Sequence, residues 1–445
     1  MKRCHLLAIG CGPFNLSLAA LASGVRGLDF VALEATKELR WHSGLMLDDA
    51  TLQVSFLADL VTLVEPTHPL SFLAYLKAKD RMYPFYIRER FHITRLEYED
   101  YLRWAVEQLP SVRFSHRVEE VEWSEAERAF TVRFTNSAGA TDTILAQHLA
   151  LGIGTAPYTP EPLRGVSKDR SAHSSDYLPR LEDIRRSPRV TIIGSGQSGA
   201  EVFLDLLRRG FPGEPQLSWL TRTGAFSPLD YTKIVLEMTT PEYVDYFHAL
   251  PEQRRNELVA EQWRHYKGIS TGTIEELHEE FYRRLAHHGD TGVELRHGTA
   301  VLGCREDDDG LTLTCHHRDT DRRFEHKTDF IVAATGYRHR PADFLAAVEP
   351  KLARDRSGRW QIRRDHSIES DLPGRIFVSN CDLHSHGVAA PDLGIGAVRS
   401  ATMLNTILPQ PVFQLPQSTA FARFNPPEDH AVSEPRARPA PEARP

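Results

Sequence analysis

The sequence of 445 residues has few cysteines, no long uninterrupted apolar run and no excess of positive charge. Its five cysteines include no C-x-x-C pair, so we expect neither a disulfide framework nor a zinc or other metal site, and a reducing cytoplasm fits best. The net charge of -7 does not favour nucleic acid as a partner. The stretch at 6–25 is interrupted by Gly, Pro and Asn, so we expect neither a signal peptide nor a membrane span. The cysteines are Cys4, Cys11, Cys304, Cys315 and Cys381.

The first recognisable unit is a short apolar strand, a glycine turn and a helix near the N-terminus, followed by a second strand, FVALEA. Gly10 and Gly12 allow a tight turn that can approach a pyrophosphate, and Asn15 replaces the third glycine of the usual fingerprint. Glu34 ends the second strand and can accept hydrogen bonds from a ribose. A lone G-x-G can be a tight turn without a ligand, but this context favours a dinucleotide site, which we assign to FAD.

A second unit of the same form begins at residue 189, with Gly194 and Gly196 followed by Gln197 and Ser198. The next strand ends in Arg222 in place of an acid, and an arginine there can pair with a 2′-phosphate. This indicates NADPH, although Arg222 as a solvated charge at a strand end is the alternative. Two different dinucleotide sites imply electron transfer between a nicotinamide and a flavin. A disulfide reductase would need a paired redox cysteine motif, which the sequence lacks.

The chain exceeds the size of a single core, so two or three domains are expected. Apolar strands running into Gly/Pro turns at 145–160 and 329–341 indicate crossings between domains. The predicted fold class is α/β, with two Rossmann-like dinucleotide-binding domains and a small, mainly helical substrate domain. The predicted ranges are 1–155 and 341–424 for FAD, 156–230 and 297–340 for NADPH, and 231–296 for the substrate, with a disordered Pro-rich tail at 425–445.

Eight motifs occur in an order and spacing that resemble the siderophore-associated N-hydroxylating flavin monooxygenases, the lysine, ornithine and diamine hydroxylases. The resemblance covers about residues 5–410. The motifs are IGCGPFNLSLAAL, RWHSGLMLDDATLQVSFLADLV, PTHPLSFLAYL, LEYEDYLRWA, GSGQSGAE, TPEYVDYF, AATGY and HGVAAPDLG. The resemblance implies that NADPH reduces FAD and that a C4a-hydroperoxyflavin then hydroxylates a neutral terminal amine. It also implies a homo-oligomer, a dimer or a tetramer, and no catalytic triad.

The resemblance assigns cofactor contacts to positions that match the family motifs. For FAD they are Gly10, Gly12, Pro13, Asn15, Glu34, Trp41, His42, Gln53, Val118, Pro391, Asp392 and Leu393. For NADPH they are Ser195, Gly196, Gln197, Ser198, Arg222, Tyr266, Lys267 and Gly268. Taken singly, Trp41 would more often be a core residue and His42 a surface or satisfied histidine.

The predicted substrate pocket is marked by the absence of charge. Where the amino-acid hydroxylases of this family read F-L-K-D-L and bind the substrate carboxylate through the lysine, this chain has Ala58. Leu236 and Tyr266 stand where the ornithine enzymes use asparagines, and Gly394 stands where they use a serine. An unpaired buried carboxylate would be costly, so a diamine is expected in place of an amino acid. The alternative is that Leu236 and Tyr266 are helix core residues and that the alignment has slipped.

The predicted function is N-hydroxylation of one amine of putrescine or cadaverine for a hydroxamate siderophore. Gln53 and Tyr266 are the candidates for positioning the amine, and no residue beyond the cofactors is assigned a catalytic role. The remote ammonium has Tyr266 or Glu237 as candidate partners. The alternatives are a lysine N6-monooxygenase of the same family and a non-catalytic dinucleotide-binding sensor. The substrate residues are predicted to be Ala58, Leu236, Glu237, Met238, Thr239, Tyr266 and Gly394.

Overall fold

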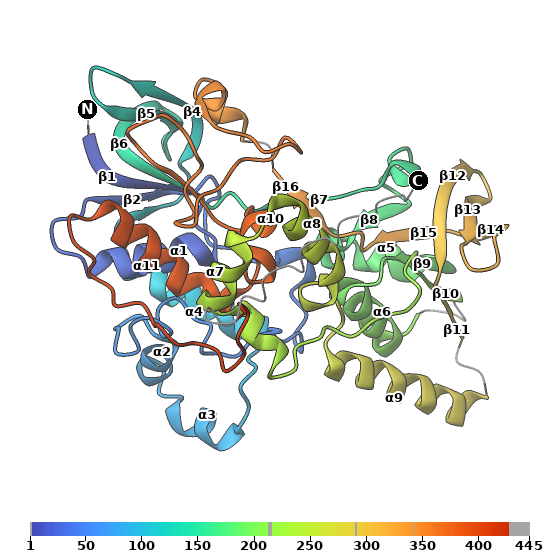
Figure 1. Ribbon diagram of the computed structural model, residues 1–445. Coiled ribbons are helices and arrows are strands. Elements are labelled where there is room, and N and C mark those ends of the chain that lie inside the picture. Colours follow the sequence, from blue (N-terminus) through green and yellow to red (C-terminus); the bar gives the residue numbers. More distant parts are fainter. Residues whose placement is uncertain (1, 212–215, 290–291, 341, 427–445) are drawn as a thin grey trace, which may run out of the picture.

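The computed structural model describes residues 2–211, 216–289, 292–340 and 342–426. It contains two large sheets with helices packed around them, one on each side of the molecule (Figure 1). The predicted α/β fold class is confirmed. Most of the predicted disordered tail, residues 427–445, lies outside the described residues. None of the described helices is long and apolar enough to cross a membrane.

The first sheet has seven strands in the order β3-β2-β1-β6-β5-β4, with β17 paired to β6. The strands β3, β2, β1, β6 and β17 are parallel to one another, whereas β4 and β5 form an antiparallel extension beside β6. Helix α1 is mostly apolar and is buried along most of its length, between this sheet and helix α11. The strands are β1 (Lys2–Ile9), β2 (Phe30–Leu33), β3 (Val112–Arg113), β4 (Arg117–Ser124), β5 (Ala129–Thr135), β6 (Thr141–Leu151) and β17 (Ile376–Val378).

The second sheet has five parallel strands in the order β11-β10-β9-β15-β8. Its strands are β8 (Ser171–His173), β9 (Arg189–Ile193), β10 (Gln216–Leu220), β11 (Val293–Arg296) and β15 (Phe330–Ala333). A three-stranded antiparallel sheet is inserted before β15, formed by β12 (Thr299–Asp307), β13 (Gly310–His317) and β14 (Arg322–Thr328). The two segments predicted to cross between domains pair with each other, as β7 (Thr155–Pro157) and β16 (Tyr337–His339).

The helices complete the layers around these sheets (Figure 1). Before strand β9 they are α1 (Pro13–Ser23), α2 (Phe72–Ala78), α3 (Met82–Arg88), α4 (Arg95–Val106) and α5 (Leu181–Arg186). In the rest of the described chain they are α6 (Gln197–Arg209), α7 (Pro241–Ala249), α8 (Glu252–Glu261), α9 (Thr271–His288), α10 (Leu383–His386) and α11 (Gly396–Ile407).

The range 231–296, predicted as one helical unit, is divided in the structure. Helices α7 and α8 pack on α10, with Tyr243, Phe247 and Leu258 forming a small core with Val388. Helix α9 instead packs on α6, and β11 pairs with β10, so both belong to the second sheet and its covering helices. The predicted unit therefore contains elements of two different layers.

Candidate active site

The two glycine turns are built in the same way. Gly10 has φ +89°, and a Cβ there would lie 2.5 Å from the carbonyl oxygen of Gly152. Gly194 has φ +132°, and a Cβ there would be closer still to the carbonyl oxygen of Ala334. Both positions require glycine, because the turn has a left-handed φ and lies against the chain that leaves the neighbouring central strand.

The second glycine of each turn faces open space. A Cβ on Gly12 or on Gly196 would meet no heavy atom within 4 Å. Helices α1 and α6 begin directly after these glycines, and neither helix has a side-chain cap at its N-terminus. The free N–H groups and the positive end of the helix dipole are therefore available to a phosphate. Both turns fit the pyrophosphate of a dinucleotide.

Asn15 and Glu34 fix the first turn from two sides. The Asn15 Nδ2 donates to the carbonyl oxygens of Gly10 at 2.9 Å and Ile9 at 3.2 Å, while its buried Oδ1 has no partner. The Glu34 carboxylate accepts from the N–H of Cys11 at 2.9 Å and that of Thr36 at 2.8 Å. Each carboxylate oxygen keeps lone pairs for a further donor, such as a ribose hydroxyl.

A cavity of about 710 Å³ begins at the first turn and extends between the two sheets. The predicted residues that line it are Gly12, Pro13, Asn15, Trp41, His42, Gln53, Gln197, Ser198, Tyr266, Pro391, Asp392 and Leu393. Gly10, Glu34, Val118, Ser195, Gly196, Arg222, Lys267 and Gly268 are not among its lining residues. We refer to this space as the central cavity.

Trp41 and His42 lie against each other at the wall of the central cavity. Their rings are 4.7 Å apart in an edge-on arrangement, and the His42 backbone is left-handed, with φ 53°. Burial, with the nearby positive charge of Arg95, lowers the pKa of His42 to about 4. The imidazole is therefore neutral at physiological pH, and it is too weak a base to take a proton from an alkylammonium ion.

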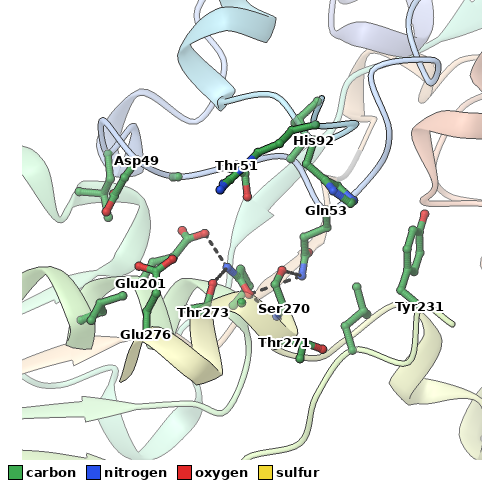
Figure 2. A pocket seen from close by; sticks show the side chains of 18 of the residues that line it. Asp49, Thr51, Gln53, His92, Glu201, Tyr231, Ser270, Thr271, Thr273 and Glu276 are labelled. Atoms are coloured by element: carbon green, nitrogen blue, oxygen red, sulfur yellow. Dashed lines mark hydrogen bonds between the residues drawn. The ribbon is translucent and has the colours of Figure 1, made fainter. Parts of the chain in front are cut away.

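A second cavity of about 600 Å³ adjoins the central cavity and shares Gln53, Gln197 and Tyr231 with it. In Figure 2 Gln53 points toward Ser270, and Gln53 Nε2 donates a hydrogen bond to Ser270 Oγ at 3.0 Å. Gln197 accepts from the Ser270 N–H at 2.7 Å and donates to Glu201 at 2.9 Å. This hydrogen-bonded chain links the segment at 51–54 to the start of α6 and the start of α9.

The chain of hydrogen bonds ends in a buried ion pair. Arg95 at the start of α4 donates two hydrogen bonds to Glu201 in α6, at 2.8 and 2.6 Å, and the two side chains are 12% and 6% exposed. The Arg95–Glu201 pair therefore joins helices that pack on different sheets. Sequence reasoning missed Arg95, Tyr231 and Ser270, although Glu201 lies in the quoted GSGQSGAE motif. No local signal identifies Arg95 or Ser270, because their partners are more than seventy residues away.

Arg222 is exposed and has no ion pair among the described residues. It lies near Lys267, whose pKa is lowered by burial and by the charge of Arg222. An anion that binds beside both cations would relieve their repulsion. This arrangement fits the 2′-phosphate of NADPH.

The predicted substrate residues are dispersed. Ala58 is 6% exposed and, like Leu236, Met238 and Thr239, is not among the lining residues of either cavity. Glu237 Oε2 accepts from the N–H of Ala422 at 2.7 Å. Tyr266 lines the central cavity and donates its hydroxyl to the carbonyl oxygen of Val259 at 3.1 Å. Gly394 lies beside Asp392, whose Oδ1 accepts from its N–H at 2.6 Å.

Known proteins share this sequence and architecture. A family described as L-lysine 6-monooxygenase/L-ornithine 5-monooxygenase matches residues 2–339. A putrescine N-hydroxylase of Shewanella oneidensis is 37% identical over 423 residues, which cover 95% of this chain and 84% of that protein. The crystal structure of DfoA bound to FAD, a cadaverine monooxygenase of Erwinia amylovora from the desferrioxamine pathway, has a TM-score of 0.92 and 37% identity, with 98% of this chain and 100% of that chain covered. The ornithine N-hydroxylase KtzI of Kutzneria, with reduced FAD, NADP+ and L-ornithine, has a TM-score of 0.84 and 26% identity, with 91% and 99% covered.

Proposed function

Since the chain belongs to the L-lysine 6-monooxygenase/L-ornithine 5-monooxygenase family, as its motifs predicted, we propose that it hydroxylates one terminal amine of an aliphatic diamine such as putrescine or cadaverine. The enzyme is a flavin-dependent N-monooxygenase that uses FAD and NADPH, and its product fits hydroxamate siderophore synthesis. The observation that carries the choice of substrate is the similarity to a putrescine N-hydroxylase and to a cadaverine monooxygenase. The sequence agrees with this choice, because Ala58 stands where a lysine would hold an amino-acid carboxylate.

FAD supplies the redox and oxygen chemistry when it is bound, and the chain holds it and shapes its surroundings. We propose that the open side of Gly12 and the N-terminus of α1 bind its pyrophosphate, while Asn15 holds the turn from behind. Glu34 is the proposed ribose contact. Trp41, His42 and Gln53 then form the wall of the central cavity beside the reacting end.

NADPH is proposed to bind at the second turn, with its pyrophosphate at Gly196 and the N-terminus of α6. Arg222 and Lys267 are the proposed pair for the 2′-phosphate. Gln197 and Ser198 reach the central cavity from this side, so the proposed NADPH site opens toward the flavin side of the cavity.

The substrate amine must be neutral to react, and the pKa of an alkylammonium ion in water is about 10.4. His42 has a pKa of about 4 and therefore does not assist this step at neutral pH. We expect hydroxylation to increase on the alkaline side of neutrality. A pH profile of hydroxylamine formation tests this, and a flat profile would contradict it.

The test of the proposed function is an amine panel of putrescine, cadaverine, lysine and ornithine. Hydroxylamine product is scored in place of NADPH loss, because uncoupled oxidation also consumes NADPH. We expect the two diamines to give the highest kcat/KM. Best turnover of lysine would instead identify a lysine N6-monooxygenase. The non-catalytic dinucleotide-binding sensor would be favoured if the purified protein is not yellow and if NADPH causes no loss of flavin absorbance under anaerobic conditions.

The assembly and location of the enzyme are also part of the proposal. We propose a homo-oligomer, a dimer or a tetramer, and a cytoplasmic site of action, as the family resemblance and the scattered reduced cysteines imply. Light scattering on the purified, FAD-loaded enzyme measures the first, and fractionation of cells that express the chain measures the second.

A further inference from the structure

Two histidines and an aspartate meet at one end of the small antiparallel sheet formed by β12, β13 and β14. His297 lies in the turn between β11 and β12, His317 is the last residue of β13, and Asp319 lies in the turn that leads to β14. One imidazole nitrogen from each histidine and one carboxylate oxygen all lie within 4.8 Å of one another. The cysteine pattern did not indicate this group, because its histidines meet only through the pairing of β12 with β13.

The backbone places the side chains of this group on one side of a turn. His317 is paired with Thr299 in the register of the two strands. The N–H of Arg318 donates to the carbonyl oxygen of Gly298 at 2.8 Å. A Cβ on Gly298, which has φ +60°, would lie 3.5 Å from Asp319 Oδ2 and 3.6 Å from His317 Nε2. Both of these atoms therefore lie over the same residue of the opposite turn.

The atoms that face one another are available to a ligand. His317 Nδ1 is directed at Thr320, whose hydroxyl lies 2.9 Å away and whose N–H lies 3.3 Å away. This leaves His317 Nε2 on the side of Asp319. In the described chain neither the His297 ring nor the Asp319 carboxylate has a hydrogen-bond or ion-pair partner. Each of the three residues thus has an uncommitted nitrogen or oxygen in the same small space.

Two imidazoles and one carboxylate form a ligand set for a divalent transition-metal ion. Imidazole nitrogen suits zinc, copper or nickel, whereas magnesium and calcium prefer oxygen ligands. Zinc binds histidine nitrogen and carboxylate oxygen at about 2.0–2.2 Å, so its ligand atoms lie about 3.3–3.6 Å apart in a tetrahedral arrangement. His297 and Asp319 are exposed, and rotations that move their ligand atoms by about an ångström would close the set around an ion.

A second group of this kind in the described chain is unsuited to a cation. His366, Asp382 and His386 are buried, and their ligand atoms also lie within 4.8 Å of one another. Arg399 Nη2 lies 3.7 Å from Asp382 Oδ2, and the two side chains are 1% and 0% exposed. This guanidinium already neutralises the carboxylate and would repel a metal ion.

The group at β12 and β13 also contacts the turn that carries Arg222. The N–H of Gly298 donates to the carbonyl oxygen of Thr223 at 2.7 Å. The N–H of Thr299 donates to the carbonyl oxygen of Thr221 at 2.7 Å. These two bonds hold the backbone on both sides of Arg222, so an ion that fixes the turn at Gly298 would also stabilise the Arg222 turn.

We propose that His297, His317 and Asp319 bind one divalent transition-metal ion and that this ion stabilises the turn around Arg222. The site is separate from the reaction centre, because its three residues are not among the lining residues of either cavity. The proposal therefore holds or fails independently of the proposed function.

Zinc is the probe for the test. The FAD-loaded, full-length enzyme, without an affinity tag and freed of metal by a chelator, is titrated with ZnCl2 by calorimetry, and bound zinc is counted by mass spectrometry after dialysis. We expect one zinc ion per chain in the wild type. His317→Ala and His297→Ala should each weaken binding at least about tenfold, because loss of a residue behind a metal ligand already costs about 10- to 100-fold.

His316→Ala is the matched control. The His316 ring neighbours His317 on the same strand, but its Nε2 lies 2.8 Å from Asp321 Oδ1, and it does not belong to the group. This variant should bind zinc as the wild type does. Absence of bound zinc in the wild type would overturn the site, as would equal binding in the wild type, His317→Ala and His297→Ala, or an equal loss in His316→Ala.

Hydrogen exchange tests the effect on the turn. With free zinc at about ten times its Kd, exchange of the Gly298 and Thr299 amides through an opening that releases the ion should slow about tenfold. The same zinc concentration should leave these amides unchanged in His317→Ala. Unchanged exchange in the zinc-loaded wild type would overturn the stabilisation of the Arg222 turn.

Discussion

Removing one partner of the Arg95–Glu201 pair should destabilise the enzyme strongly. At about 4 Å between charge centres and an effective dielectric constant of about 20, the attraction is about 4 kcal/mol, which desolvation of the two buried ions largely offsets. A single substitution, however, leaves the other charge buried and unpaired, at a cost of about 3–5 kcal/mol. Glu201→Leu leaves the Arg95 guanidinium charged and without its partner. The Arg95 side chain is only 12% exposed and lies close to His42.

The magnitude is measured by a double-mutant cycle on the FAD-loaded enzyme. Urea unfolding is followed by circular dichroism and by release of flavin fluorescence for the wild type, Glu201→Leu, Arg95→Met and the double variant. We expect each single variant to lose about 3–5 kcal/mol in the free energy of unfolding. The double variant should lose much less than the sum, because both charges are then gone.

The exposed pair Arg133–Glu120 is the matched control. Its nitrogen–oxygen distance of 2.5 Å is as short as that of the buried pair, but its side chains are 48% and 41% exposed. Solvent screens this interaction, so Glu120→Leu should leave the unfolding curve unchanged. Additive losses in the cycle, or equal losses for the buried and exposed pairs, would refute the reasoning from burial.

Three further predictions concern other sites. Ala58→Lys introduces a cation at a buried position, so KM for putrescine should rise more than KM for lysine; unchanged diamine kinetics would place residue 58 outside the substrate's reach. Arg222→Ala should lower kcat/KM for NADPH about tenfold and leave NADH unaffected, and an equal fall for both would exclude a contact with the 2′-phosphate. The pKa of His148 is lowered from 6.5 to about 4, chiefly by burial, so the unfolded chain binds its proton at a higher pH than the folded chain. The free energy of unfolding should therefore fall by about 3 kcal/mol from this group as the pH drops through that window, and His148→Gln should remove that part of the slope in urea titrations.

The sequence was sufficient to predict features whose cause is local. Gly10 and Gly194 are required by the turn itself, and each lies between a buried strand and an uncapped helix that the apolar pattern already indicates. The family motifs also predicted much of the wall of the central cavity, including Trp41, His42 and Gln53. The roles assigned to these residues stay predictions.

The sequence was not sufficient where a long-range contact decides the outcome. The apolar period of residues 271–288 predicts a helix, but it does not say that this helix packs on α6 and not on α7 and α8. Asp392 was assigned to the flavin by its motif, whereas its partnership with Tyr231, 161 positions earlier in the chain, depends on how the two segments fold together. Charge pairing across such distances has no periodic signature in a sequence.

The two dinucleotide turns are connected through the segments that cross between the two sheets and pair as β7 and β16. Gly152 and Ala334, which press on the two turns, are the first residues after the central strands β6 and β15. A few residues later the same two segments pair as β7 and β16, and the N–H of Tyr158 donates to the carbonyl oxygen of Gly336 at 2.9 Å. A change in the angle between the two sheets would therefore also move the segments that support both turns. The spacing between the two proposed cofactor sites is thus set by the backbone that forms their turns. The hydrogen-bonded side chains that run from Gln53 to Arg95 form a second connection between the two parts of the protein.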